Sequence, residues 1–176
     1  MSNFLKHTLR LLIFILIQVY VLNKIHLHRF IIPSLYYLPL LWLPFSISRQ
    51  RLMIIGFCTG LALDYFMMTP GLHAGACVLI VYVRPFLINI LTPRDSSEFN
   101  YREPSPKAMQ WTPYMVYVLI LTLLHHIYVT FLEWLSFGRF LDFIIKIIAT
   151  TGISMLLIFT VELLFPRRLR FRTNTA

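Results

Sequence analysis

Residues 56–94, GFCTGLALDYFMMTPGLHAGACVLIVYVRPFLINILTPR, decide the fold of this chain. Two apolar runs, about Leu52–Met68 and Leu72–Leu91, meet at Thr69-Pro70-Gly71, a sequence typical of a tight turn. A helix of ~20 predominantly apolar residues is long enough to cross the hydrocarbon core of a bilayer. The stretch therefore predicts a hairpin of two membrane-spanning helices.

Small residues give each arm of this hairpin a face for close packing. Gly56, Gly60 and Asp64 lie four residues apart, so they share one face of the first helix. Gly71 and Gly75 give the start of the second helix its own small face. Because small residues at this spacing let helix backbones approach closely in membranes, we expect the hairpin to be tightly packed.

Two charges, Asp64 and Arg84, interrupt the apolar hairpin. A charge at membrane depth costs ~2.5–3.5 kcal/mol even on lenient insertion scales, so such a residue is usually paired or functional. Pro85 loosens the backbone next to Arg84, whose long side chain is expected to reach Asp64 or to snorkel to phosphate headgroups. Asp64 is too short to reach water from that depth.

The composition places the whole chain in a membrane. Hydrophobic residues make up 58% of the sequence and charged residues 13%, with a mean hydropathy of +0.72. Soluble domains are about a quarter charged. We expect an all-α integral membrane protein with a single domain over residues 1–165 and a basic tail over 166–176.

Apolar runs of helix length predict six transmembrane helices. Three prolines, Pro33, Pro39 and Pro44, interrupt the second run, so we expect that span to be bent or partly re-entrant. A polar segment over about 92–112 predicts an irregular cytoplasmic surface loop. The expected spans are about Phe4–Leu22, Phe30–Ile47, Leu52–Met68, Leu72–Leu91, Pro113–Trp134 and Phe140–Phe165.

The positive charges predict the orientation. With six spans, most Lys and Arg residues fall on one side, and the positive-inside rule places that side, with both termini, in the cytoplasm. That side holds Lys6, Arg10, Arg49, Arg51, Arg94, Arg102, Lys107, Arg167, Arg168, Arg170 and Arg172, against Lys24, Arg29 and Arg139 on the other. Topology and anionic lipid bound by the tail explain the net charge of +9, so we expect no nucleic-acid partner.

Polar residues at membrane depth form a second candidate cluster. At ~1.5 Å rise per residue, Asp64 and the His125-His126 pair are expected at similar depths. A proton relay, a polar ligand site, a docking surface made by Asp64 and Arg84, and purely structural pairing all remain open. Adjacent histidines point ~100° apart on a helix, so at most one of the two is expected to face inward.

Neither the remaining charged residues nor the sequence motifs indicate a catalytic site. Glu133, Asp142, Lys146 and Glu162 lie close enough to an interface for snorkelling or pairing to explain them. The sequence holds no nucleophile elbow, phosphate-cradling glycine loop or metal-binding HExxH. We therefore expect no catalytic residue, cofactor or metal site, and no enzymatic activity.

The hairpin motif resembles the rod shape-determining protein MreD family. The resemblance lies in Gly56-Phe-Cys-Thr-Gly60-Leu-x-x-Asp64, followed by Gly71-Leu-His73-Ala74 and Arg84-Pro85. Arg84-Pro85 and Pro93-Arg94-Asp95 are similar to the forms found in Bacteroidetes. The candidate structural or partner-binding residues are Gly56, Gly60, Asp64, Gly71, His73, Arg84 and Pro85.

The resemblance implies a non-enzymatic scaffold of the elongasome, the bacterial cell-shape complex that supports lateral peptidoglycan synthesis at the inner membrane. Its implied partner is the bitopic protein MreC, which links it to the MreB filament, the RodA glycosyltransferase and a penicillin-binding transpeptidase. The implied fold is similar to the membrane substrate-binding component of energy-coupling-factor transporters. A small-solute or vitamin-binding transport subunit is therefore the alternative function.

Overall fold

The computed structural model describes residues 3–25, 32–92, 103–135 and 139–165. All regular structure in these residues is helical. The tail 166–176 and residues 93–102 of the predicted loop lie outside the described residues. The elements are α1 (Asn3–Tyr20), the 3₁₀ turn η1 (Leu22–Lys24), α2 (Leu38–Leu41), α3 (Arg49–Met67), α4 (Leu72–Leu91), α5 (Pro106–Met109), α6 (Trp111–Trp134) and α7 (Phe140–Leu164).

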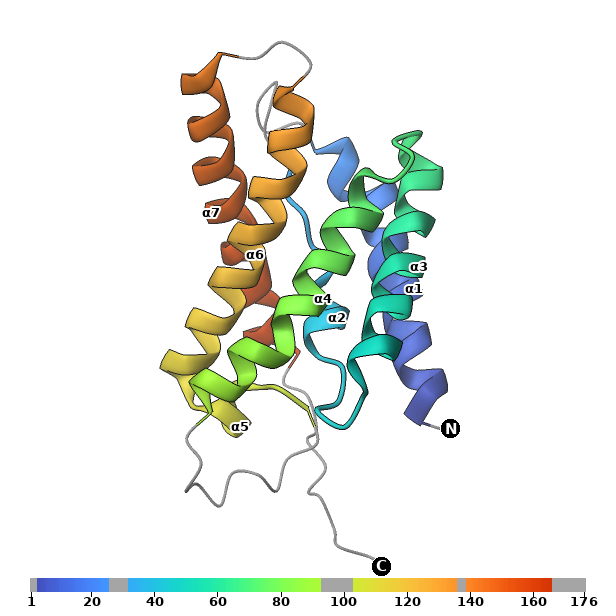
Figure 1. Ribbon diagram of the computed structural model, residues 1–176, viewed down its shortest axis with the longest axis vertical. Coiled ribbons are helices and arrows are strands. Elements are labelled where there is room, and N and C mark those ends of the chain that lie inside the picture. Colours follow the sequence, from blue (N-terminus) through green and yellow to red (C-terminus); the bar gives the residue numbers. More distant parts are fainter. Residues whose placement is uncertain (1–2, 26–31, 93–102, 136–138, 166–176) are drawn as a thin grey trace, which may run out of the picture.

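The long helices lie side by side, with α1, α3 and α6 running up the view of Figure 1 and α4 and α7 running down it. Helix α4 packs between α3 and α6, α7 packs on α6, and α1 packs on α3. The starts of α1 and α6 and the ends of α4 and α7 lie at one end of the bundle, where α5 also lies (Figure 1). The hairpin of α3 and α4 thus lies between α1 on one side and the α6–α7 pair on the other.

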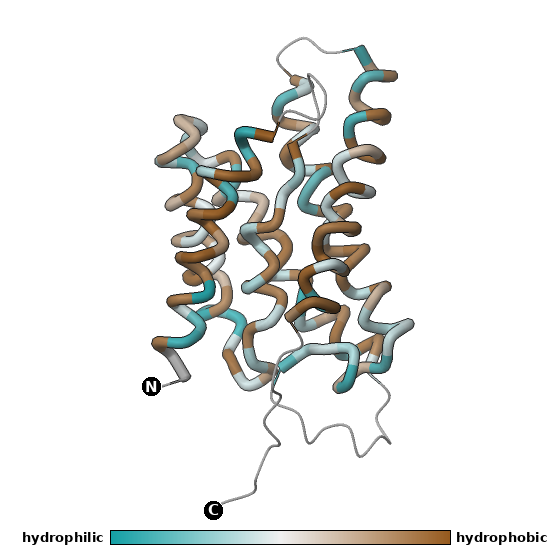
Figure 2. Tube along the Cα trace, turned by 180° about the vertical axis from the view of Figure 1, so that it is seen from behind, coloured by the Kyte–Doolittle hydropathy of each residue, from teal (hydrophilic) through white to brown (hydrophobic). Residues whose placement is uncertain are grey.

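Hydropathy confirms a multi-pass α-helical membrane protein. In the described part of the chain, four helices are long and apolar enough to cross a membrane, namely those over Leu5–Lys24, Leu72–Leu91, Trp111–Trp134 and Phe140–Leu164. Hydrophobic residues dominate the middle of the long helices, and much of the hydrophilic chain lies toward the two ends (Figure 2). Helix α3 is nearly as long but carries Arg49, Arg51 and Asp64.

The predicted second span is not a continuous helix. Over residues 32–48 the chain is non-helical except for the four residues of α2, and it threads through the bundle between the long helices (Figure 1). Prolines 33, 39 and 44 explain this, since each lacks a backbone N–H and disfavours helix in the residue before it. Every residue from Leu35 to Leu43 is nevertheless buried. We call residues 32–48 the threaded segment.

The expected irregular surface loop over 92–112 also needs correction in its described part. Residues 106–109 form α5, whose Ala108 and Met109 are buried in the core. The Ser105 side chain caps this turn by accepting the N–H of Ala108 at 3.1 Å, and Pro106 suits the first helical position. A local cap and a proline therefore turn the chain back into the bundle before α6 begins.

The small face of α3 packs directly against α4. A Cβ built on Gly60 would overlap the Ala74 backbone and lie 2.5 Å from the His73 carbonyl oxygen. A Cβ on Gly56 would come within 2.8 Å of the Val81 side chain. The predicted close approach of the two helices is confirmed, and it is tightest at Gly60, where backbone meets backbone.

The two glycines at the start of α4 have other roles. Gly71 has a φ of +87° and precedes α4 as its N-cap residue, so it serves the turn. Gly75 faces α6, because a Cβ there would collide with the Tyr128 side chain. The small face predicted from Gly71 and Gly75 is therefore divided between the turn and the α4–α6 contact.

We predict that Gly60→Ala destabilises the protein. The added methyl group would force α3 away from the α4 backbone, and overpacking of this kind costs ~1–3 kcal/mol. Gly152→Ala on α7 is the matched control, since no atom lies within 4 Å of a Cβ at that position. Thermal unfolding in detergent should show a lower melting temperature for Gly60→Ala alone. Equal melting temperatures for the two variants would contradict the close packing.

Candidate functional site

Asp64 lies in the last turn of α3 and accepts hydrogen bonds from the start of α4. Its Oδ2 accepts the N–H groups of Gly71 and Ala74 at 3.1 and 2.9 Å. Its Oδ1 accepts the His73 N–H at 2.9 Å and the Thr69 hydroxyl at 3.0 Å, and lies 2.8 Å from His73 Nδ1. The carboxylate is 1% exposed and caps α4 from the neighbouring helix. It thus satisfies N–H groups that have no partner within α4.

The position of Asp64 explains how a buried carboxylate is tolerated here. A helix N-terminus carries about half a positive charge, and anionic groups placed there are stabilised. His73, a residue of the hairpin motif, adds a side-chain partner to this cap. The hydrogen bonds of Asp64 in the described structure all stay within the hairpin, and none reaches Arg84, His125 or His126.

Arg84 neither snorkels nor pairs with Asp64. Its side chain is 1% exposed. Its Nε donates to the Tyr117 hydroxyl at 3.0 Å, and an Nη donates to the Leu43 carbonyl oxygen. Ten residues separate Arg84 from Ala74, which is ~15 Å along the helix axis. This distance is too long for Arg84 to meet the carboxylate that caps the other end of α4, so the expected pairing is wrong.

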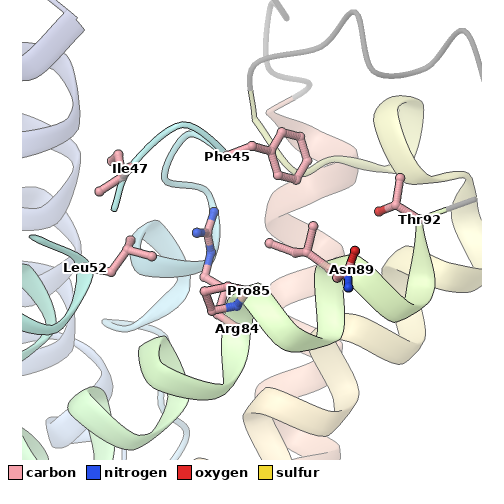
Figure 3. A pocket seen from close by; sticks show the side chains of 8 residues that line it. Phe45, Ile47, Leu52, Arg84, Pro85, Asn89 and Thr92 are labelled. Atoms are coloured by element: carbon pink, nitrogen blue, oxygen red, sulfur yellow. The ribbon is translucent and has the colours of Figure 1, made fainter. Parts of the chain in front are cut away.

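Pro85, the residue after Arg84, lies inside α4 without ending it. The helix continues to Leu91. Because a proline removes one backbone N–H, α4 lacks one intrahelical hydrogen bond at this point. Pro85 lies directly beside the buried guanidinium group (Figure 3).

Both histidines of the expected cluster face inward, which corrects the prediction that at most one would. His125 is 1% exposed and its Nε2 lies 2.6 Å from the Tyr36 hydroxyl oxygen. His126 is 4% exposed and its Nε2 lies 3.1 Å from Ser154 Oγ on α7. Helix α6 packs against α4 and α7, and the threaded segment contacts it as well. The side chains of His125 and His126, which point ~100° apart, can therefore both face the interior.

Side chains from four helices hydrogen-bond to the backbone of the threaded segment, and no sequence pattern predicted these contacts. Gln18 of α1 donates to the Pro33 carbonyl oxygen at 3.0 Å and accepts the Leu35 N–H at 2.8 Å. Ser154 of α7 accepts the Ser34 N–H at 2.9 Å. Two further side chains act as donors. Tyr117 of α6 donates its hydroxyl to the Leu41 carbonyl oxygen at 3.0 Å, and Arg84 of α4 donates to the Leu43 carbonyl oxygen.

The four charged residues expected to pair or snorkel behave in two ways. Lys146 pairs with Glu133 at 2.6 Å, and Asp142 pairs with Arg139 at 3.1 Å, as expected near an interface. Glu162 instead is buried. It accepts hydrogen bonds from Trp42 Nε1 at 2.7 Å and from the Tyr114 hydroxyl. The position of Glu162 inside an apolar run was the available signal for a buried role.

The interior polar groups form separate clusters. In the described structure, Asp64 and His73 form one, Tyr36 and His125 a second, and His126 and Ser154 a third. The Tyr36 ring contacts both His73 and His125 edge-on, at centroid distances of 5.7 and 5.5 Å. No direct hydrogen bond joins Tyr36 to His73 in the described structure, so these two clusters meet only through the contact of their rings.

A small cavity lies beside these clusters. Its volume is about 90 Å³, and its polar lining includes Gln18, Tyr36, His73 and His126. At about 30 Å³ per molecule this space accommodates ~3 waters, whereas small-molecule pockets measure ~300–1,000 Å³. Within the described residues, no three His, Cys, Asp or Glu side chains are grouped as metal ligands would be.

Comparison of the chain with protein-family models, curated proteins and solved structures gives no match. The candidate site therefore rests on its own geometry.

We predict that Asp64→Asn lowers thermal stability. The asparagine keeps one oxygen, and its amide group donates where the carboxylate accepted, so two or more N–H groups at the start of α4 lose their partner. Each buried group left unpaired costs ~1–3 kcal/mol. Asp142→Asn is the control, because its ion pair with Arg139 is exposed and such pairs contribute little. An unchanged melting temperature for Asp64→Asn would exclude the cap as a stabilising contact.

We predict that Tyr36→Phe destabilises the bundle by leaving His125 without a side-chain hydrogen bond. His125 Nδ1 already has no partner, so loss of the Tyr36 hydroxyl leaves both ring nitrogens unpaired in the interior. The expected cost is ~1–3 kcal/mol, measured by thermal unfolding. Tyr65→Phe is the matched control, since Tyr65 is 76% exposed. Identical unfolding of the two variants would show that the Tyr36–His125 contact adds no stability.

Proposed function

We propose that this protein is a non-enzymatic membrane scaffold of the bacterial cell-elongation complex, as its resemblance to the MreD family implies. The supporting observation is that the motif residues serve the internal structure of the α3–α4 hairpin. Gly60 allows the close approach, Gly71 makes the turn, and Asp64 with His73 caps α4. A hairpin held together by these contacts offers a rigid surface to a partner. The Asp64 carboxylate already accepts hydrogen bonds from within the hairpin.

A six-crossing topology fits this proposal. Five long helices and the threaded segment would give six passages through the membrane, the second of them largely non-helical. The described ends nearest both termini lie at one end of the bundle (Figure 1), and the basic residues favour the cytoplasm for that end. The inner membrane is the location that follows, with the basic tail 166–176 on anionic lipid.

The partner we propose is an MreC-like bitopic protein. Helix α3 presents an exposed stripe, Ile54, Phe57, Leu61 and Tyr65, on the side away from its glycines. A single membrane-spanning helix could pack along such a stripe by van der Waals contact, which drives helix association in membranes. Through this partner the scaffold would act with the MreB filament, the RodA glycosyltransferase and a penicillin-binding transpeptidase.

A small-solute or vitamin-binding transport subunit is the alternative function. The cavity beside Tyr36, His73 and His126 is its supporting observation, since its polar lining could orient a ligand. Its volume of about 90 Å³ is below the ~300–1,000 Å³ of small-molecule pockets, so the scaffold is the better supported function.

The test is mild purification of the tagged protein from its native membranes, with co-purifying proteins identified by mass spectrometry. We expect an MreC-like bitopic protein and wall synthases. Recovery of an ATP-driven transport module, or of a tightly retained small solute, would replace the scaffold with the transport subunit. Recovery of neither set would also contradict the scaffold.

We further predict that the exposed stripe on α3 determines how much of the bitopic partner co-purifies with the protein. Phe57→Ala combined with Tyr65→Ala should reduce co-purification of the bitopic partner at least tenfold while thermal stability is unchanged, because both side chains point away from the bundle. Leu119→Ala combined with Leu123→Ala, on the exposed face of α6, is the matched control. Equal recovery from both double variants would place the partner on another surface.

A further inference from the structure

A second cavity lies at the opposite end of α4 from Asp64. Its volume is about 180 Å³, and it is bounded by the end of the threaded segment and the last turns of α4 (Figure 3). Three polar side chains of α4 and its C-cap line it, namely Arg84, Asn89 and Thr92. None of the contacts described above explains this polar lining.

Arg84 brings an uncompensated positive charge to this cavity. A guanidinium group has five N–H donors and stays protonated in proteins, and Arg84 uses two groups, Nε and one Nη, in its contacts with Tyr117 and Leu43. Among the described residues, no carboxylate lies within ion-pair distance of it. Burying a charge without a counter-ion costs several kcal/mol, so an anionic ligand would be strongly favoured here.

The α4 dipole does not supply the missing negative charge. The C-terminal end of a helix carries about half a negative charge, but the effect is confined to the last turn. Helix α4 ends at Leu91, seven residues after Arg84. That separation is ~10 Å along the axis, so the guanidinium group lies about two turns from the helix end.

Thr92 supplies a second, independent sign of a ligand. Its Oγ1 is buried and has no hydrogen-bond partner among the described residues, although buried hydroxyl groups are nearly always paired. With Arg84 and Asn89, the lining of the cavity thus includes a cationic group, a hydroxyl and an amide. This set of donors suits the oxygen atoms of a phosphate group.

The other wall of the cavity is apolar. Phe45, Ile47 and Leu52 line it opposite the polar groups (Figure 3). The space equals that of ~6 water molecules, which is enough for a phosphate group but far too small for acyl chains. A lipid would therefore insert its headgroup while its chains lie along the exposed apolar surface of the bundle. The cavity lies beside the last turns of α4, at the end of the helix that we expect to lie near the lipid headgroups.

We propose that this cavity is a specific binding site for the phosphate group of an anionic phospholipid. Arg84 supplies the charge, Thr92 and Asn89 supply further donors, and Phe45 shields the group from the side. Because Arg84 also holds Leu43, the bound lipid would brace the end of the threaded segment against α4. This site is separate from the basic tail and does not depend on the proposed scaffold function.

The test is native mass spectrometry of delipidated protein after lipids are added back. We expect phosphatidylglycerol to be retained and diacylglycerol with the same acyl chains to be lost, since only the former has a phosphate group. Arg84→Gln should weaken phosphatidylglycerol binding at least tenfold. Arg49→Gln should leave it unchanged, because Arg49 carries the same charge near the same end of the bundle but is exposed. Equal retention of the two lipids by the unmodified protein would overturn the proposal.

A second variant separates binding from folding. Arg84→Gln also removes the contacts to Leu43 and Tyr117, whereas Thr92→Val removes only an unpaired hydroxyl. Thr92→Val should therefore weaken phosphatidylglycerol binding several-fold at an unchanged melting temperature. Unchanged binding by this variant would exclude Thr92 and, with it, the donor set proposed here.

Inorganic phosphate distinguishes the two sources of the same chemical group. We expect millimolar phosphate neither to displace phosphatidylglycerol nor to raise the melting temperature, because it lacks the chains that anchor a lipid. Arg84-dependent stabilisation by inorganic phosphate, without lipid retention, would overturn the lipid as the ligand.

Discussion

The rest of the structure depends on one constraint, which is that the non-helical backbone of the threaded segment must find hydrogen-bond partners inside a membrane protein. Lipid supplies none, and each unsatisfied group costs several kcal/mol. Four helices therefore each place a polar side chain against residues 33–43, from Gln18, Arg84, Tyr117 and Ser154. In the sequence, the polar residues scattered through the apolar helices look like separate functional sites. In the fold, they are largely hydrogen-bond partners of the threaded segment.

Asp64 and Arg84 illustrate two outcomes of the same requirement. Each satisfies backbone groups, Asp64 the N–H groups that begin α4 and Arg84 the carbonyl oxygen of Leu43. The charge of Asp64 is matched by the positive end of the α4 dipole and by His73. The charge of Arg84 has no such match among the described residues. A neutral donor could also bond to the Leu43 carbonyl oxygen, so the backbone contact alone does not require the charge of Arg84.

The sequence predicted best what depends on neighbours along the chain. The α3–α4 hairpin follows from local spacing, and Gly56 and Gly60 pack against α4 as expected. Pro33, Pro39 and Pro44 led us to expect a second span that is bent or partly re-entrant, but hydropathy records side chains and did not show that only Leu38–Leu41 would be helical. Both His125 and His126 are buried because α6 has interior neighbours on two sides, and no single-helix pattern contains that information. The partners of Arg84 likewise come from segments distant in sequence, so only the folded bundle shows them.

The threaded segment also bears on what the bundle can hold. Residues 35–43 are all buried, and the rings of Tyr36 and Tyr37 contact His125 in the space between the helices. A transport subunit would need that space for its solute, and emptying it would leave the segment's backbone groups and the polar side chains of four helices unpaired at once. Filling the centre with chain instead of ligand makes the bundle rigid. A filled centre is consistent with the proposed scaffold, whose partner and lipid would bind at the outer surface.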